Sequence, residues 1–355
     1  MKLINLRLLV VALVTLFSLN AQASGGSGKK FNASEMIMHH ITDAHEWHLA
    51  GDAALYLPVI LKTENGFDMF SSSELYHNPI TLEVDGKEET AFTYQSDKGS
   101  YIMFHEKIYY AGTDGLVFEE GHPTNETPMD FSITKNVLSM FIGVLILILV
   151  FAATGKKYKN SLSPKGIAKF MEPLVLYVRD EIAVPNIGKH KANKFLPYLL
   201  TVFFFIWINN LLGLVPFFPG GANVTGNIAV TAVLAIITFI ITNINGNKHY
   251  WGHIFAMPGV PKFVLIILTP VEILGLFTKP FALAVRLFAN ITAGHIVVLG
   301  LVSLIFIFQN YMVAPVSIIM VLFISCLELL VAFLQAYVFT LLSALFIGMA
   351  VEEAH

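Results

Sequence analysis

The longest apolar stretch in the chain reads FVLIILTPVEILGLFTKPFALAVRLFANITAGHIVVLGLVSLIFIF, from Phe263 to Phe308. One membrane crossing needs only about 20 apolar residues, so this stretch predicts a helix that is either bent or strongly tilted. Gly275, Pro280 and Gly294 are candidate positions for a bend. A second long apolar stretch, from Pro315 to Val351, predicts the helix that returns across the membrane.

The composition of the whole chain agrees with a membrane protein. Of its 355 residues, 55% are hydrophobic and only 13% are charged, whereas about a quarter of the residues of a soluble domain are charged. The same apolar content excludes a disordered chain. The net charge of −3 gives no argument for a nucleic-acid partner. The single cysteine, Cys326, excludes an intrachain disulfide and a metal site built from cysteines.

Charged residues are concentrated in the N-terminal part of the chain. From Phe195 onward the charged residues are Lys248, Lys262, Glu272, Lys279, Arg286, Glu328, Glu352 and Glu353. This distribution predicts a polar N-terminal region joined to a membrane domain over residues 131–355.

The N-terminus has the features of a cleaved signal peptide. Lys2 and Arg7 give a positively charged start before a short apolar run from Leu8 to Leu19, and Ala21-Gln22-Ala23 fits a cleavage site. We therefore expect residues 1–23 to be a signal peptide, with a first transmembrane helix as the alternative. Cleavage would place the mature N-terminus on the periplasmic side of a bacterial inner membrane.

Residues 24–130 predict a small α+β periplasmic region. Phe31 to Leu49 is expected to be a short helix. Two alternating segments, Ile80 to Val84 and Ala91 to Tyr94, flank Asp85-Gly86 and predict a β-hairpin. Tyr101 to Tyr110 predicts one further strand.

Four histidines in this region, His39, His40, His45 and His48, raise the question of a metal site. On a helix, His45 and His48 would share one face, and histidine is the commonest metal ligand. The H-E-x-x-H pattern is absent, however, and His39 does not share that face well. A polar helix near the membrane is therefore favoured over a metal site, and we expect neither a metal nor a cofactor.

Charge alternation between loops predicts the topology. Besides the two long stretches, Phe131 to Thr154, Phe195 to Pro216 and Ile228 to Ile244 are predicted spans, and Lys156 to Lys159 marks a cytoplasmic loop. Pro164 to Ile182 has apolar residues at helical spacing with charges between them, which is typical of an interfacial helix. The predicted fold is an all-α polytopic membrane domain. It has five transmembrane helices, the last two long and tilted, plus one interfacial amphipathic helix, with a periplasmic N-terminus and a cytoplasmic C-terminus.

Ionisable residues within the predicted spans are costly and are therefore candidate functional residues. Arg286 is the strongest candidate, because a guanidinium cannot lose its charge. Glu272 and Lys279 precede it at seven-residue steps and share its stripe of the helix. Asn290 lies four residues further along the same face, whereas His295 is turned to roughly the opposite side.

The last predicted helix contributes Glu328 and Gln335, which are seven residues apart and share one stripe. Because the two long helices are antiparallel, His295 and Glu328 fall in the outer half, Arg286 and Gln335 near the middle. Glu272 falls near the inner face. The alternative is a set of polar residues that only join helices. That interpretation suits Asn290 and Gln335 but not Arg286.

Three stretches of this chain resemble recurrent stretches of the subunit a family of F-type ATP synthases. The most specific is LFTKPFALAVRLFANITAGH, from Leu276 to His295; the others are NNLLGLVP, from Asn209 to Pro216, and LQAYVF, from Leu334 to Phe339. The resemblance runs from about Asn136 to His355. Some members carry the acid near the arginine helix and the histidine on the last helix. Here His295 and Glu328 are exchanged, as in the mitochondrial form.

The resemblance implies a proton-translocating stator subunit that is not catalytic by itself. Arg286 would face the carboxylate of the rotor c-ring. The periplasmic half-channel would be lined by Asn290, His295, Glu328 and Gln335, and Glu272 would lie by the cytoplasmic half-channel. The implied partners are the c-ring, stator subunit b and the lipid bilayer, with H⁺ as the transported ion.

Two other classes of protein remain as alternatives to this interpretation. A proton-coupled secondary transporter would usually show inverted repeats and broken helices, and we find neither in this sequence. A membrane-embedded hydrolase would need a nucleophile with a base or a metal site. The candidate serines have neither, and His295 is the single histidine within the predicted spans; these serines are Ser303, Ser317, Ser325 and Ser343.

Overall fold

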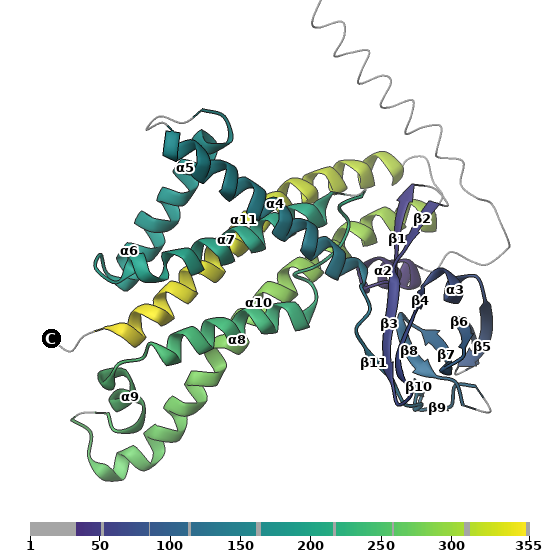
Figure 1. Ribbon diagram of the computed structural model, residues 1–355, viewed down its shortest axis with the longest axis horizontal. Helices are drawn as coiled ribbons and strands as arrows, with labels where there is room; N and C mark the ends of the chain where they lie inside the picture. Colours follow the sequence, from purple (N-terminus) through teal and green to yellow (C-terminus); the bar gives the residue numbers. More distant parts are fainter. Residues whose placement is uncertain are drawn as a thin grey trace, which may run out of the picture.

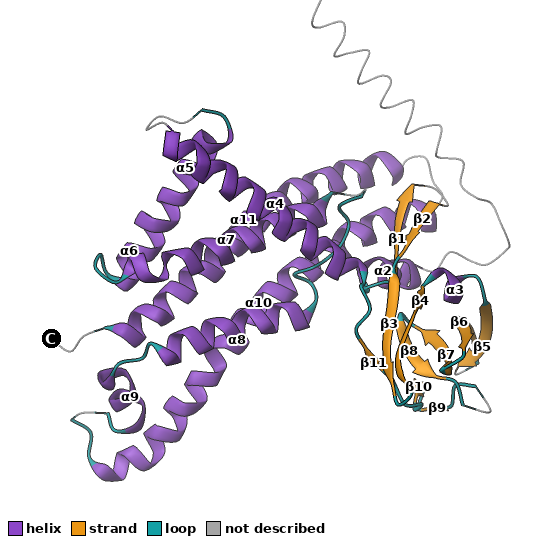
Figure 2. Cartoon of the chain, in the orientation of Figure 1, coloured by secondary structure: helices purple, strands orange, loops and turns teal. Residues whose placement is uncertain are grey.

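The computed structural model describes residues 33–50, 53–84, 86–112, 115–160, 165–215, 218–257, 259–308 and 313–352. The predicted signal peptide lies outside these residues. Figure 2 shows two regions of different secondary structure, with strands gathered at one end of long helices. The mostly helical architecture with a small α+β N-terminal region agrees with the sequence prediction.

The N-terminal region is built mainly from antiparallel strands. Its largest sheet is a four-stranded meander in the order β5-β6-β7-β8, and a three-stranded sheet has the order β11-β3-β4. The elements are α2 (Ala33–Ile41), β1 (Glu46–Ala50), β2 (Ala53–Tyr56), β3 (Pro58–Thr63), β4 (Gly66–Ser71), α3 (Ser73–Tyr76), β5 (Pro79–Val84), β6 (Lys87–Ser96), β7 (Gly99–Phe104), β8 (Lys107–Tyr110), β9 (Phe118–Glu119), β10 (His122–Pro123) and β11 (Met129–Asp130).

The predicted hairpin is confirmed, because β5 pairs with β6 from Pro79↔Phe92 to Val84↔Lys87. The single strand predicted over Tyr101 to Tyr110 is wrong. The chain reverses there at His105 and Glu106, which adopt positive φ angles of 48° and 63°. A two-residue turn with two positive φ angles joins adjacent antiparallel strands, so the segment forms the two strands β7 and β8.

The helix predicted over Phe31 to Leu49 is also wrong in its second half. It ends at Ile41, and the next element is β1, which pairs with β2. Trp47 on β1 is buried in an apolar cluster with Ala222 and Val224. His45 and His48 therefore do not share a helix face.

The rest of the chain is helical. Its elements are α4 (Lys135–Asn160), α5 (Ile167–Tyr177), η1 (Val178–Ala183), α6 (Val184–Ile187), α7 (Ala192–Leu214), α8 (Ile228–Ile244), α9 (Lys248–Phe255), α10 (Lys262–Phe308) and α11 (Val313–Val351). In the described ranges, the helices α4, α7, α10 and α11 are long and apolar enough to cross a membrane. The pair α8 and α9, bent by 105°, could provide a fifth span. The chain thus has four or five candidate spans.

The predicted interfacial helix is longer than expected and changes its hydrogen-bonding pattern. It begins at Ile167 and passes through one π-helical segment, η1, before it ends at Ile187. Val178 and Ile182 are buried in the core, whereas Phe170 is exposed. This arrangement gives the segment one buried side and one exposed side.

Helix α7 is the centre of the helical region. Leu199, Phe203 and Ile206 on this helix are fully buried in the main apolar core, which also includes residues of α10, α11 and η1. Figure 1 shows α10 and α11 as the two longest helices, and their joined ends point towards the β-rich region. With 47 residues, α10 is about 70 Å long. It continues through Pro270 and Pro280, which favours tilt over a break.

The β-rich region is attached to the helices through Trp47. Its indole Nε1 donates a hydrogen bond to the carbonyl of Gly220 at 3.0 Å, and its ring contacts Phe218 edge-on with centroids 5.1 Å apart. Trp47 is also buried against Ala222 and Val224 in the loop before α8. Helix α2 packs against α10, so the region covers the end of the bundle near the α10–α11 connection.

Candidate functional site

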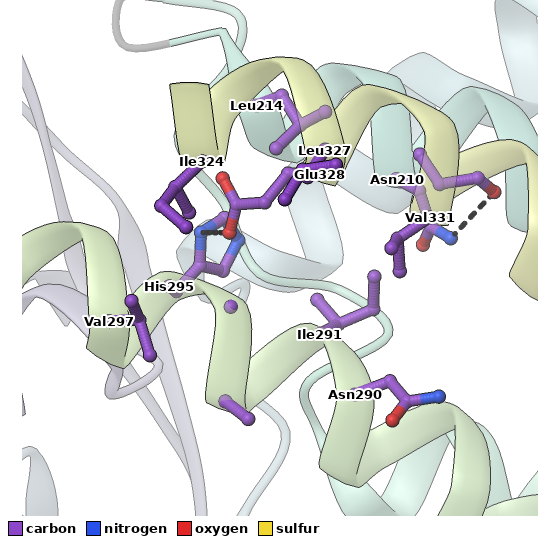
Figure 3. A pocket seen from close by; sticks show the side chains of 13 residues that line it. Asn210, Leu214, Asn290, Ile291, His295, Val297, Ile324, Leu327, Glu328 and Val331 are labelled. Carbon is purple, nitrogen blue, oxygen red and sulfur yellow. Dashed lines mark hydrogen bonds and ion pairs between the residues drawn. The ribbon is translucent and has the colours of Figure 1, made fainter. Parts of the chain in front are cut away.

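A polar pair lies between the two longest helices. His295 on α10 and Glu328 on α11 face each other, with 4.0 Å between Nδ1 and Oε1, as Figure 3 shows. Both side chains are largely buried, with exposed fractions of 19% and 13%. They line a cavity of about 270 Å³. An imidazole and a carboxylate beside a cavity of this size can exchange protons with each other and with water.

One glycine, Gly294, makes room for this pair, whereas a side chain at Gly213 would meet His295 only at an ordinary contact distance. A Cβ atom on Gly294 would lie 2.5 Å from Oε1 of Glu328, closer than real contacts allow. A Cβ on Gly213 of α7 would lie 3.8 Å from Nε2 of His295. The absence of a side chain at Gly294 therefore allows the glutamate to reach α10.

Asn210 on α7 forms another wall of the cavity. Its Nδ2 donates to the carbonyl of Ala332 at 3.3 Å, and its Oδ1 accepts from the hydroxyl of Thr225 at 2.5 Å. It thereby joins α7 to α11 and to the loop before α8. In the sequence, Asn209-Asn210 is noted only as part of the family resemblance. The available signal was a pair of amides in an otherwise apolar span.

Arg286 lies on the exposed surface of α10. Within the described residues it has no recorded hydrogen bond or ion pair. It is nine residues before His295, or about 13.5 Å along the helix. A permanent cation at membrane depth requires a compensating group.

The structure separates the other predicted site residues. Asn290 lines the same cavity as His295 and Glu328. Gln335 is buried two turns beyond Glu328 and does not line the cavity. Glu272 is half-buried, about 21 Å from Arg286 along α10. Three of the six predicted residues thus share one cavity, and the remaining three lie along the two helices beyond it.

A smaller cavity of about 20 Å³ lies nearer the other end of the bundle. Polar side chains from α8, including Thr238, Thr242 and Asn243, line it together with Lys279. The ammonium of Lys279 lies 5.7 Å from the centroid of the Phe346 ring. Lys279 therefore turns towards α8 and α11, whereas Arg286 remains exposed.

In the β-rich region, His45 is buried between two carboxylates. Its Nδ1 is 3.8 Å from Glu106 and its Nε2 is 3.5 Å from Asp130. Burial lowers the pKa of His45, but interactions with Asp130 and Glu106 outweigh that effect and raise the pKa to about 9. The part of the chain that the structure describes contains no group of three or more His, Cys, Asp or Glu residues that could hold a metal ion. The side chains of His39, His40 and His48 lie outside that description.

The fold and the site define a multi-pass helical membrane protein with a polar site between two antiparallel helices and, further along α10, an exposed arginine for which the described residues record no ion pair. A family model described as ATP synthase A chain matches residues 137–348, and the chain belongs to this family, subunit a of the F-type ATP synthases of bacteria. The family resemblance predicted from the sequence is thereby confirmed.

Curated relatives extend this match. The chain is 52% identical over 238 residues to "ATP synthase subunit a" of Chloroherpeton thalassium. This match covers 64% of this chain and 70% of the relative. It is 45% identical over 323 residues to "ATP synthase subunit a 2" of Prosthecochloris aestuarii. This second match covers 85% of this chain and 93% of the relative. The second match is longer than the helical region and so includes part of the N-terminal region. A model described as a domain of unknown function matches residues 36–131.

Proposed function

We propose that this chain is the stator subunit that provides two proton half-channels to the rotor ring of an F-type ATP synthase. Proton flow through them would load and unload the rotor carboxylates and so couple transport to rotation and ATP synthesis. The observation that carries the proposal is the exposed Arg286, which has no recorded ion pair among the described residues, on the same helix as the buried His295–Glu328 pair.

The outer half-channel is the cavity between α10 and α11. A proton that enters from the periplasm reaches Glu328 and His295, which can exchange it. Asn290 lies on the same cavity wall, towards Arg286. Gln335 supplies an amide on the same stripe of α11 as Glu328, seven residues further along, and can hydrogen-bond water on the way to the rotor.

Arg286 separates the two half-channels. Its exposure on α10 lets it face a carboxylate of the c-ring directly. A deprotonated rotor carboxylate is held by this cation, and a protonated one leaves it and can enter lipid at far lower cost. The same fixed charge repels a free proton. Each charge that crosses 100 mV is worth about 2.3 kcal/mol, so a leak past Arg286 would dissipate the driving force.

The inner half-channel lies on the opposite side of Arg286. Glu272 is the acidic group of α10 in this direction, and the small cavity around Lys279 supplies polar groups of α8. A proton released by the rotor would leave towards the cytoplasm along this end of α10.

This assignment also sets the partners and the orientation. The c-ring faces α10 and α11, and stator subunit b and lipid cover other parts of the helical surface. Residues 24–130 lie in the periplasm after removal of residues 1–23. Residues 131–355 lie in the inner membrane, with the C-terminus in the cytoplasm.

The test is ATP synthesis by vesicles that contain Arg286→Ala in the complete enzyme. We expect proton-driven synthesis to be abolished, because the rotor carboxylate loses its counterion. Arg179→Ala is the matched control, since Arg179 is an exposed arginine that already pairs with Asp180 at 2.7 Å. Normal synthesis in Arg286→Ala would exclude the proposed function. Copurification without a small carboxylate-bearing ring protein would instead favour a secondary transporter.

A further inference from the structure

One face of the three-stranded sheet β11-β3-β4 is apolar and exposed. Four of its side chains, which we call the sheet patch, are more than half exposed: Phe67 at 54%, Met69 at 67%, Met129 at 64% and Phe131 at 58%. Phe67 and Met69 belong to β4, Met129 belongs to β11, and Phe131 follows it directly. Exposed hydrophobic side chains normally occur singly on a protein surface, whereas a contiguous group marks an interaction site.

Strand pairing makes the sheet patch one continuous surface. Cross-strand neighbours point to the same face of a sheet. Two rows of neighbours cross the three strands: the first contains Met129, Lys62 and Phe67, the second Phe131, Ile60 and Met69. The rings of Phe67 and Phe131, which come from the two outer strands, lie 6.3 Å apart. The four exposed side chains thus surround the central strand β3.

The opposite face of the same sheet is buried. Side chains alternate along a strand, so Val59 and Leu61 of β3 point away from the sheet patch. Both are fully buried, in a core that also contains Tyr101, Met103 and Ile108 of β7 and β8. Figure 1 shows β11 and β3 on the side of the β-rich region next to the helices, with β5 to β8 beyond them. The sheet patch therefore points to the side on which the helices lie.

Backbone hydrogen bonds fix the sheet patch to the beginning of α4. The amide of Phe131 donates to the carbonyl of Ile60 at 2.8 Å, and the amide of Ile133 donates to the carbonyl of Pro58 at 3.1 Å. The amide of Lys135, the first residue of α4, donates to the carbonyl of Ala44 at 2.9 Å. The segment between the sheet and the helix is therefore no free linker, and the position of the sheet follows that of α4.

The length of α4 sets the depth of the sheet patch. The candidate span Lys135–Tyr158 has 24 residues, or about 36 Å, and the hydrocarbon core is about 30 Å thick. Phe131 is four residues before this span, at most about 14 Å away. The headgroup layer occupies about 5–8 Å beyond the hydrocarbon core on each side. The sheet patch therefore lies at or next to the headgroup layer.

The apolar surface continues from the sheet patch onto α4 itself. Along α4, apolar side chains that are more than half exposed recur at helical spacing on one side: Phe141, Leu145, Ile148 and Leu149. In a span, such a side faces lipid unless a partner covers it. The sheet patch and this side of α4 are separated only by the first turn of the helix, so one lipid surface can contact both.

The charges around the sheet patch also suit a membrane surface. Lys62 lies within the patch, and the ammonium of Lys98 donates to the carbonyl of Phe67 beside it. Along the described strands β3, β4 and β11 no carboxylate takes an outward position, because Asp68 and Asp130 alternate with the exposed residues and point to the other face. Aromatic and basic side chains next to an apolar face are typical of the membrane interface.

We propose that the sheet patch rests on the lipid surface at the N-terminal end of α4, which is the outer leaflet in the orientation given above. Its four apolar side chains enter the boundary between headgroups and acyl chains, and Lys62 meets the headgroup phosphates. The β-rich region is then a second membrane contact of this subunit. The contact requires only that α4 crosses the membrane, so it is independent of the proton pathway.

The test is fluorescence quenching in the complete enzyme, in vesicles of equal parts of phosphatidylethanolamine and phosphatidylglycerol. Cys326→Ala removes the single cysteine, and Met69→Cys then carries a fluorescent label. Interfacial apolar faces enter the boundary by about 5–10 Å. We therefore expect lipids brominated on their acyl chains to quench this label at least half as strongly as a label on Leu145→Cys of α4, and iodide in the water to quench it little.

Thr81→Cys is the matched control. Thr81 is exposed on β5, the edge strand of the four-stranded sheet, which Figure 1 shows away from the helices. Its label should be quenched by iodide and not by brominated lipid. If the label on Met69→Cys behaves in the same way, the sheet patch is open to water and the inference is overturned.

Protection of the Met69→Cys label from both quenchers would also overturn the inference, since another subunit would then cover the sheet patch. If this variant does not assemble, Met129→Cys in the neighbouring row provides the same measurement with the same expected result. The Arg286→Ala variant separates the two proposals. Loss of synthesis in that variant together with iodide quenching at Met69→Cys refutes the lipid contact alone.

Discussion

Gly294 offers the sharpest test of the polar site, because a side chain at this position would collide with Glu328. In Gly294→Ala the new Cβ would lie 2.5 Å from Oε1 of Glu328, and an ordinary contact is about 1 Å longer. The glutamate side chain can swing away, so the protein should still assemble. Alanine also favours the helix over glycine by about 1 kcal/mol.

The displaced carboxylate can no longer hold its 4.0 Å distance from His295. A misplacement of about 1 Å in a reacting group can cost about 100-fold in rate. We therefore expect proton flow through Gly294→Ala to fall by about 10- to 100-fold, while the thermal stability of the enzyme is unchanged or slightly higher. The assay is proton uptake by vesicles under an imposed gradient.

Gly300→Ala is the matched control, since Gly300 lies on the same helix and its added Cβ meets nothing within 4 Å. Gly300→Ala should gain the same helix propensity without a loss of proton flow. The double variant Gly294→Ala/Glu328→Asp shortens the acid and should recover part of the activity. Equal flow in Gly294→Ala and Gly300→Ala would refute the role of the His295–Glu328 geometry.

Three further predictions concern Arg286, Trp47 and His45. Arg286→Lys should also fail in ATP synthesis, because a compact ammonium does not reproduce the guanidinium fork; synthesis near the wild-type rate would contradict this. Trp47→Ala should weaken the attachment of the β-rich region by about 3–5 kcal/mol, and limited proteolysis should then cut the chain just before α4 sooner than in the wild type. The raised pKa of His45, about 9 against the usual 6.5, contributes stability below pH 6.5 that is lost as the pH rises through 9. It is worth at most about 3 kcal/mol. Thermal unfolding of the purified chain between pH 6 and 10 should show this loss, and His45→Gln should remove it.

The membrane domain was predictable because its signals are local. The apolar stretch around Arg286 and the charges of the loops depend on the neighbouring sequence alone, and α8 was predicted with its bounds at Ile228 and Ile244. The number of spans was harder to predict from the sequence, because α8 is short and the chain bends by 105° between α8 and α9. Hydropathy does not report such a bend.

The β-rich region was predicted less well, for a reason visible at His45. The segment from Thr42 to Leu49 has no strong helix or strand periodicity of its own. Its conformation depends on pairing of β1 with β2 and on burial of Trp47 against the loop at Gly220. Strand β2 follows β1 within a few residues, but the loop at Gly220 is distant in sequence, so local patterns could not decide between a helix and a strand.

The sequence by itself determined that this is a membrane protein and which ionisable groups its long helices carry, because hydropathy and the cost of a buried charge act residue by residue. Only the tertiary structure decided which of these groups meet. His295 and Glu328 come together because glycine at position 294 lets α11 approach α10 closely, and Arg286 stays exposed because of the rotation of α10 in the bundle. Helix rotation and close approach depend on packing across the whole domain, and a single stretch of sequence does not contain that information.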